Sequence, residues 1–246
     1  MTTTPRESSI WAVTATYNER ENLGQLAEGM LALPFGVTTL IVDDDSPDGT
    51  GDLADGLAQS HPGRFAVIHR PGKLGYGSAH RLGIEYALDR GADIVITMDA
   101  DLSHNPDRIP SMVDALADHD LVIGSRYAPG GGTANWGLDR RILSRGAGLM
   151  VRIASGMPYR DPTSGYRAYR ADLLHRAHFE EALQEGYAFL YEMLFRCHRT
   201  GASITEVPIV FVDRRAGKSK MSKKIILESA LRLLPIFWRR ITGWRP

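Results

Sequence analysis

The sequence has 246 residues, 43% of them hydrophobic and 24% charged, and a mean hydropathy of -0.21. This composition is typical of a globular protein and excludes fibrous and intrinsically disordered chains. The single cysteine, Cys197, cannot form an intramolecular disulfide, and the N-terminal residues lack the pattern of a signal peptide. No apolar stretch is long enough to span a bilayer. We therefore expect a cytoplasmic protein without a spanning helix.

Short apolar runs alternate with helical segments in the first half of the chain. The runs are rich in Val, Ile and Leu and predict strands over residues 10–15, 39–43, 65–69, 94–98 and 121–124. Helices are predicted over residues 19–33, 49–59 and 78–90, the first with Asn18 as its N-cap and Glu21 three positions later. Strands without polar alternation are typical of a sheet covered on both faces. The pattern predicts an α/β fold with a mostly parallel sheet flanked by helices.

The second half of the chain is less regular. A Gly- and Pro-rich stretch over residues 128–135 predicts a mobile loop. Helices are expected near residues 142–155 and 189–199, and a strand over residues 204–212. No linker indicates a second compact unit, so we expect one domain over residues 1–220 and a helical tail over residues 221–246.

Charge is distributed unevenly although the 29 basic and 29 acidic residues balance. Residues 214–246 carry a net charge of +9, whereas residues 1–213 carry -9. The tail also has an apolar side, which includes Phe237 and Trp238, and Pro235 is expected to kink or divide its helix. Basic amphipathic segments bind anionic surfaces such as lipid headgroups. An ordinary helix packed on its own domain remains the alternative.

Acidic residues follow three of the predicted strands. The segments are 15–19, which ends in Glu19, 43–50, which begins with Asp43 and Asp44, and 99–104, which contains Asp99 and Asp101. In an open α/β sheet, ligands bind at the carboxyl ends of the strands. Turn chemistry explains Asp48 but not Asp44 or the closely spaced Asp99 and Asp101, since like charges repel unless a cation or a donor-rich ligand neutralises them. Carboxylate ligands favour Mg²⁺ or Mn²⁺, which share their coordination with substrate phosphates.

The order and spacing of these segments resemble glycosyltransferase family 2, and within it the polyprenol (dolichyl) phosphate mannose synthases. The resemblance extends from residue 10 to residue 220. It rests on Ala-Thr-Tyr-Asn-Glu (15–19), Val-Asp-Asp-x-Ser-Pro-Asp-Gly-Thr (42–50), Lys-x-Gly-Tyr-Gly (73–77), Asp-Ala-Asp-Leu-Ser-His (99–104), Gly-Ser-Arg-Tyr (124–127), Asp-Pro-Thr-Ser-Gly-Tyr-Arg-Ala-Tyr (161–169) and Phe-Val-Asp-Arg-x-x-Gly-x-Ser-Lys (211–220). It implies a GT-A fold, GDP-mannose as donor, and a polyprenyl phosphate in the membrane as acceptor. Nucleic acid is not an expected partner, and a separate membrane-anchoring subunit remains open.

The resemblance also implies roles for individual residues. Asp99, Asp101 and Arg126 would be catalytic, and Asp99, Asp101 and Ser103 would hold the metal. The nucleotide-sugar site would comprise Ala15, Tyr17, Glu19, Val42, Asp44, Asp99, Ala100, Asp101, Ser103, Arg126, Arg214 and Lys220.

The sequence departs from the family pattern at two of these positions. Family members often have Pro at the position of Ala15 and Gln at that of Ser103, and the shorter Ser103 side chain puts the metal preference in doubt. Two other functions stay open: a family 2 enzyme that transfers glucose or an aminosugar from a UDP-sugar to a lipid phosphate, and a nucleotide-binding subunit without turnover.

Overall fold

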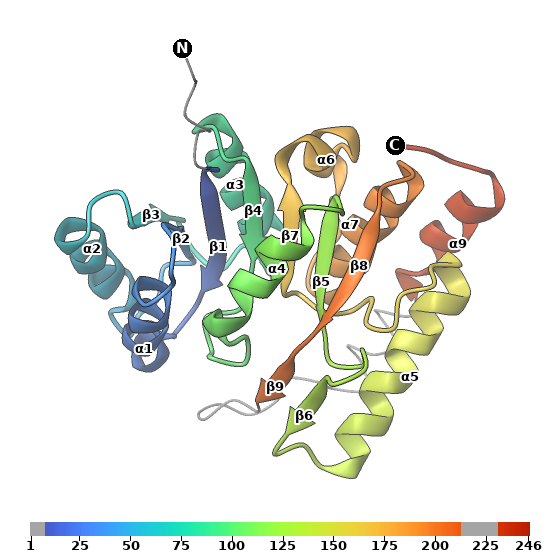
Figure 1. Cartoon of the computed structure of the whole chain (residues 1–246), viewed down its shortest axis with the longest axis horizontal. Helices are drawn as coiled ribbons and strands as arrows, with labels where there is room; N and C mark the ends of the chain where they lie inside the picture. The colour runs from blue at the N-terminus through green and yellow to red at the C-terminus, as the bar shows by residue number, and fades with distance from the viewer. Residues whose placement is uncertain (1–7, 213–230) are drawn as a thin grey trace.

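The computed structural model describes residues 8–212 and 231–246 (Figure 1). The described strands of its main sheet are β1 (Ile10–Thr16), β2 (Thr38–Asp43), β3 (Phe65–His69), β4 (Ile94–Thr97), β5 (Leu121–Ser125), β7 (Arg167–Arg170) and β8 (Ile204–Pro208). They are arranged in the order β3-β2-β1-β4-β7-β5-β8. All neighbours are parallel except at β7, which is antiparallel to β4 and β5. The predicted α/β fold with a mostly parallel sheet is confirmed.

The helices that follow these strands are α1 (Arg20–Leu31), α2 (Thr50–Ser60), α3 (Tyr76–Asp89), α4 (Ile109–Ala115), α5 (Leu138–Ser155), α6 (Ala171–Arg176), α7 (Tyr187–Arg199) and α9 (Leu234–Ile241). Two short 3₁₀ helices, η1 (Pro106–Arg108) and η2 (Phe179–Glu181), precede α4 and α7.

Two apolar layers cover the two faces of the sheet. On β1, Ala12 packs in the layer that contains residues of α1, α2 and α4, whereas Val13 packs in the layer that contains residues of α3, α6 and α7. Successive residues of a strand point to opposite faces, so strands buried on both faces need continuous apolar sequence. α3 lies close to β1 because Gly83 has no side chain, and a Cβ there would overlap Val13. Because the parallel strands run in the same direction, their carboxyl ends lie together at one edge of the sheet (Figure 1).

Three local predictions are corrected by the structure. Asn18 is not an N-cap: it has a left-handed φ of 61°, and Glu19 precedes α1 without a side-chain cap. The reason is the loop after β2, which covers this end of α1, so that Asp48 accepts a hydrogen bond from the Arg20 N–H at 3.2 Å. Residues 128–135 contain the strand β6 (Gly132–Ala134), which pairs with β9 (Val210–Val212). The single strand predicted over residues 204–212 is therefore divided, with Ile209 between β8 and β9.

The tail is described from residue 231 onward, and residues 221–230 lie outside the described residues. Pro235 lies in the first turn of α9. Backbone N–H groups in the first turn of a helix have no hydrogen-bond partner within the helix, so a proline is tolerated at this position. α9 packs on α5 (Figure 1), and the Arg240 guanidinium donates to the Ile153 carbonyl at 2.6 Å. Within the described residues, none of the helices has both the length and the apolar character needed to cross a bilayer.

Candidate active site

The turn after β4 holds the two carboxylates predicted to bind metal. The Asp101 side chain is buried, and its Oδ1 accepts from the Ser103 N–H at 3.1 Å and from the Ser103 hydroxyl at 2.5 Å. The Asp99 side chain is 27% exposed, and its backbone N–H donates to Nδ1 of His104 at 2.9 Å. Burial lowers the pKa of His104, which is consistent with a neutral ring that accepts at Nδ1. Leu102 completes the turn with a left-handed φ of 63°, a strained conformation for this residue.

This turn fits a divalent cation that shares its ligands with a substrate. Its donors are carboxylate oxygens, the kind that Mg²⁺ and Mn²⁺ prefer. Across residues 8–212 and 231–246, no three His, Cys, Asp or Glu side chains form a group that could enclose a metal. If Asp99 and Asp101 bind a cation together, the remaining ligands would come from phosphate and water. Ser103 holds Asp101 in this structure, and Ala100 is buried beside them.

The loop after β2 brings a second acidic pair to the same edge. Asp44 forms an ion pair with Arg70 at 2.7 Å, and both side chains are less than a tenth exposed. Burial raises the pKa of Asp44, and Arg70 and the backbone N–H groups of Gly75 and Leu74 offset this only in part. Sequence reasoning missed Arg70, because nothing local to residue 70 indicates the pairing.

Asp43 has a different role from Asp44. It is buried and accepts hydrogen bonds from the Thr16 hydroxyl at 2.9 Å and from the Ser46 hydroxyl at 2.6 Å. The Ser46 N–H also donates to Asp43, at 3.0 Å. Asp43 therefore joins the ends of β1 and β2 and shapes the loop that carries Asp44.

The other residues predicted for the nucleotide pocket lie along β1 and β2. Ala15 and Val42 are partners in the parallel register, and the Val42 side chain is fully buried in the core, so only its backbone is available to a ligand. The Tyr17 ring lies 4.0 Å below the Lys73 ammonium. The Glu19 carboxylate accepts from the Asn22 amide at 2.7 Å. The structure thus brings the predicted residues of β1 and β2 to one edge.

Arg126, predicted to contact phosphate, is held by a carboxylate of its own chain. Its Nε and Nη2 donate to the two oxygens of Asp161 at 2.7 and 2.6 Å, and its backbone N–H donates to Asp161 at 2.9 Å. Although burial opposes charge on both groups, their mutual attraction raises the pKa of Arg126 and lowers that of Asp161. Arg126 is therefore a fixed cation beside the edge, and Asp161 is a partner that sequence reasoning did not assign.

The glycine-rich segment before α3 is not a phosphate-binding loop in this structure. The Glu185 carboxylate accepts from the N–H groups of Gly77 and Ser78 at 2.7 and 2.9 Å. The positive end of α3 is thus occupied by an internal carboxylate. Arg214 and Lys220, the two other predicted cations, lie outside the described residues.

Residues 11–178 match the family described as glycosyl transferase family 2. An undecaprenyl-phosphate mannosyltransferase from Micrococcus luteus is 44% identical over 224 residues, which cover 90% of this chain and 91% of that protein. A polyprenol monophosphomannose synthase from Mycolicibacterium smegmatis is 42% identical over 219 residues, which cover 89% of this chain and 83% of that protein.

Among solved structures, glucosyl-3-phosphoglycerate synthase from Mycobacterium tuberculosis, in complex with Mn²⁺, UDP and glucosyl-3-phosphoglycerate, has a TM-score of 0.64 at 19% identity, covering 97% of this chain and 81% of that one. Mannosyl-3-phosphoglycerate synthase from Rubrobacter xylanophilus has a TM-score of 0.65 at 17% identity, covering 96% of this chain and 74% of that one. These likenesses confirm the expected GT-A fold. The family match and the two curated relatives show that this chain belongs to glycosyltransferase family 2.

Proposed function

We propose that this protein transfers mannose from GDP-mannose to a polyprenyl phosphate, with inversion at the anomeric carbon. The observation that carries the proposal is the turn after β4, where Asp99 and Asp101 stand two residues apart at the edge shared with Asp44. The names of the relatives that match along most of the chain support the sugar and the acceptor class. The metal, the roles of single residues and the site of action in the cell are part of the proposal.

The chemistry explains why two carboxylates and fixed cations are sufficient. A phosphate monoester is largely ionised at pH 7, so the acceptor needs no strong general base. When bound by Asp99 and Asp101, Mg²⁺ or Mn²⁺ would neutralise the charge that develops on the departing diphosphate. Arg126, held by Asp161, contributes a fixed positive charge near the anionic substrates. Arg214 and Lys220 are proposed phosphate contacts on the basis of the family pattern.

Recognition of the nucleoside is proposed for the ends of β1 and β2. The residues involved would be Ala15, Tyr17, Glu19, Val42 and Asp44, with Val42 contributing its backbone. The Asp44 carboxylate is oriented by Arg70 at 2.7 Å and is thus a rigid acceptor at this edge. We expect GDP to inhibit better than UDP.

The protein must also reach an acceptor whose chain lies in a bilayer, and we propose that it does so as a peripheral protein at the cytoplasmic face. Two neighbouring helices expose large apolar side chains. These are Leu138, Ile142, Leu149 and Ile153 on α5, and Leu234, Phe237, Trp238 and Ile241 on α9. We call these eight residues the apolar face. On α5 they recur at intervals of four or seven residues and so form one stripe.

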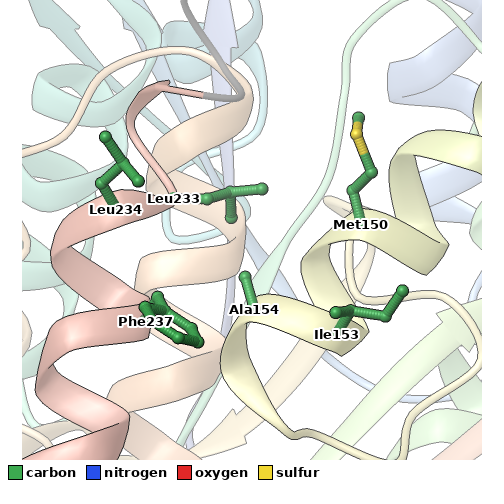
Figure 2. A pocket seen from close by; sticks show the side chains of 6 residues that line it. All are labelled: Met150, Ile153, Ala154, Leu233, Leu234 and Phe237. Carbon is green, nitrogen blue, oxygen red and sulfur yellow. The ribbon is translucent and has the colours of Figure 1, made fainter.

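An apolar groove joins the two helices of this face, with a volume of about 300 Å³. Figure 2 shows its lining, formed by Met150, Ile153, Ala154, Leu233, Leu234 and Phe237. Exposed arginines on the same helices, among them Arg141, Arg145 and Arg240, suit anionic headgroups. The proposed occupant of the apolar face is therefore the lipid interface, and an anchoring subunit is the alternative that the vesicle experiment below distinguishes.

The transfer reaction is tested with purified protein, labelled GDP-mannose, Mn²⁺ or Mg²⁺ and a polyprenyl phosphate. UDP-glucose and UDP-N-acetylglucosamine run in parallel. We expect mannosyl transfer that stops in excess EDTA, with a β-linked product by NMR. Preferential transfer from a UDP-sugar would refute the donor, full turnover in EDTA would refute the metal, and absence of any transfer would favour a nucleotide-binding subunit.

A further inference from the structure

The hydroxyl of Tyr76 contacts Asp99, one of the two carboxylates of the site. Tyr76 is the first residue of α3, and its hydroxyl donates to Oδ1 of Asp99 at 3.3 Å. The tyrosine ring is held by its neighbours: its centroid lies 4.0 Å from that of His80, and Phe189 meets it edge-on at 6.4 Å. The direction of the hydroxyl is therefore fixed by packing.

A glycine makes room for this hydroxyl. A Cβ at Gly165 would lie 2.8 Å from the Tyr76 hydroxyl oxygen, closer than a real Cβ contact. The position of Gly165 is itself fixed, because its carbonyl accepts from the Thr97 hydroxyl at 2.8 Å. The backbone on the other side is fixed by Glu185, which binds the N–H groups of the two residues after Tyr76.

We propose that Tyr76 is a positioning residue, which orients the Asp99 carboxylate for the divalent cation of the transfer reaction. The inference rests on the proposed metal-dependent function and adds a residue to it. A donor on Oδ1 limits rotation of the carboxylate, and partners of this kind commonly tune the affinity of a metal site.

The same segment also contacts the opposite side of the site. The Gly75 carbonyl accepts a hydrogen bond from Arg70 at 3.2 Å, and Arg70 pairs with Asp44, while the next residue, Tyr76, binds Asp99. One short segment thus sets the positions of a carboxylate after β2 and a carboxylate after β4. We therefore expect an effect of Tyr76 on cation binding when the nucleotide is present.

The test compares Tyr76→Phe with Tyr169→Phe. Tyr169 is a matched control, because it is buried on β7 and its hydroxyl takes part in a hydrogen bond of the same length, 3.3 Å, with Arg167. Binding of Mn²⁺ is measured by the electron paramagnetic resonance signal of free Mn²⁺ in the presence of GDP, without acceptor. A weakening on the order of 10-fold is expected for Tyr76→Phe and none for Tyr169→Phe.

A second variant displaces the Tyr76 hydroxyl without changing Tyr76 itself. Gly165→Ala places a Cβ against the hydroxyl, so it should weaken Mn²⁺ binding as well, and the double variant with Tyr76→Phe should be little worse than either alone. Unchanged Mn²⁺ binding in Tyr76→Phe, equal weakening in Tyr169→Phe, or no Mn²⁺ binding by the wild-type protein with GDP would overturn the proposal. These Mn²⁺-binding assays need no turnover. They therefore test the role of Tyr76 even if mannosyl transfer is not observed.

Discussion

Replacing two isoleucines of the apolar face should detach the protein from lipid while leaving its chemistry intact. Ile142 and Ile153 on α5 are 64% and 66% exposed, so their side chains contribute little to the core. Burying a whole isoleucine side chain is worth about 1.5–3 kcal/mol. Transfer of the exposed two-thirds into an interface is therefore worth about 1–2 kcal/mol for each residue.

The double variant Ile142→Ser, Ile153→Ser should thus lose about 2–4 kcal/mol of membrane binding, which is a reduction of between about 30-fold and about 1000-fold. The assay is flotation with vesicles that contain anionic phospholipid, at low and at high salt. Salt screens the arginines of α5 and α9 but not the apolar contribution. Wild-type binding is expected to weaken with salt and to persist.

A control variant on another helix and a second substrate separate this reasoning from a folding defect. Leu82→Ser removes an exposed apolar side chain from α3, outside the apolar face, and should leave vesicle binding unchanged. Transfer to a short, water-soluble polyprenyl phosphate should survive in the double variant, whereas transfer to a long-chain acceptor in vesicles should fall. If the double variant binds vesicles as well as the wild type, the reasoning is refuted. If the wild-type protein does not bind vesicles, a partner subunit on the apolar face is favoured.

Three further predictions concern the edge of the sheet. Asp161→Asn should destabilise the fold by about 3–5 kcal/mol in urea unfolding, because it leaves the buried Arg126 guanidinium without a counter-charge. Since the folded-state pKa of Asp161 is lowered, its contribution is present above the unfolded pKa of about 3.9 and is lost as pH falls through the folded value, so the variant should show less acid sensitivity than the wild type. Asp101→Ala should abolish transfer but retain the circular dichroism spectrum. Glu185→Gln should cost about 1 kcal/mol in thermal unfolding, because an amide oxygen binds the first N–H groups of α3 more weakly than a carboxylate.

The strands were predictable where burial on both faces demands continuous apolar sequence. β3 was predicted with its observed bounds, and β1, β2, β4 and β5 to within one residue at each end. β7 was missed because its sequence, Arg-Ala-Tyr-Arg, begins and ends with a charged residue. Arg167 is nevertheless fully buried, since its guanidinium donates to the carbonyls of Leu190 and Pro162 at 2.6 and 2.9 Å. A partner 23 residues away cannot be inferred from the local pattern.

In the site, the sequence predicted residues that directly follow a strand. It did not predict residues whose role depends on a contact with another part of the chain. Asp99 and Asp101 follow a buried strand, so topology alone brings them to the edge. Arg70, Tyr76 and Asp161 were given no role from the sequence, although Tyr76 and Asp161 lie in segments of the family pattern, because each acts through a contact with another element. The roles of the predicted residues in binding and catalysis stay predictions.

Backbone conformation gives an independent reason to locate function at this edge. Three residues other than glycine have left-handed φ angles in the loops that follow β1, β2 and β4: Asn18 at 61°, Asp45 at 56° and Leu102 at 63°. Such conformations cost on the order of 1–3 kcal/mol and persist where surrounding contacts impose them. Around Leu102 those contacts are the hydrogen bonds of Asp101 with Ser103 and of Asp99 with His104. The conformation disfavoured by a leucine is thus maintained by the same contacts that fix Asp99 and Asp101 on this turn, which supports the proposal that the turn binds a divalent cation.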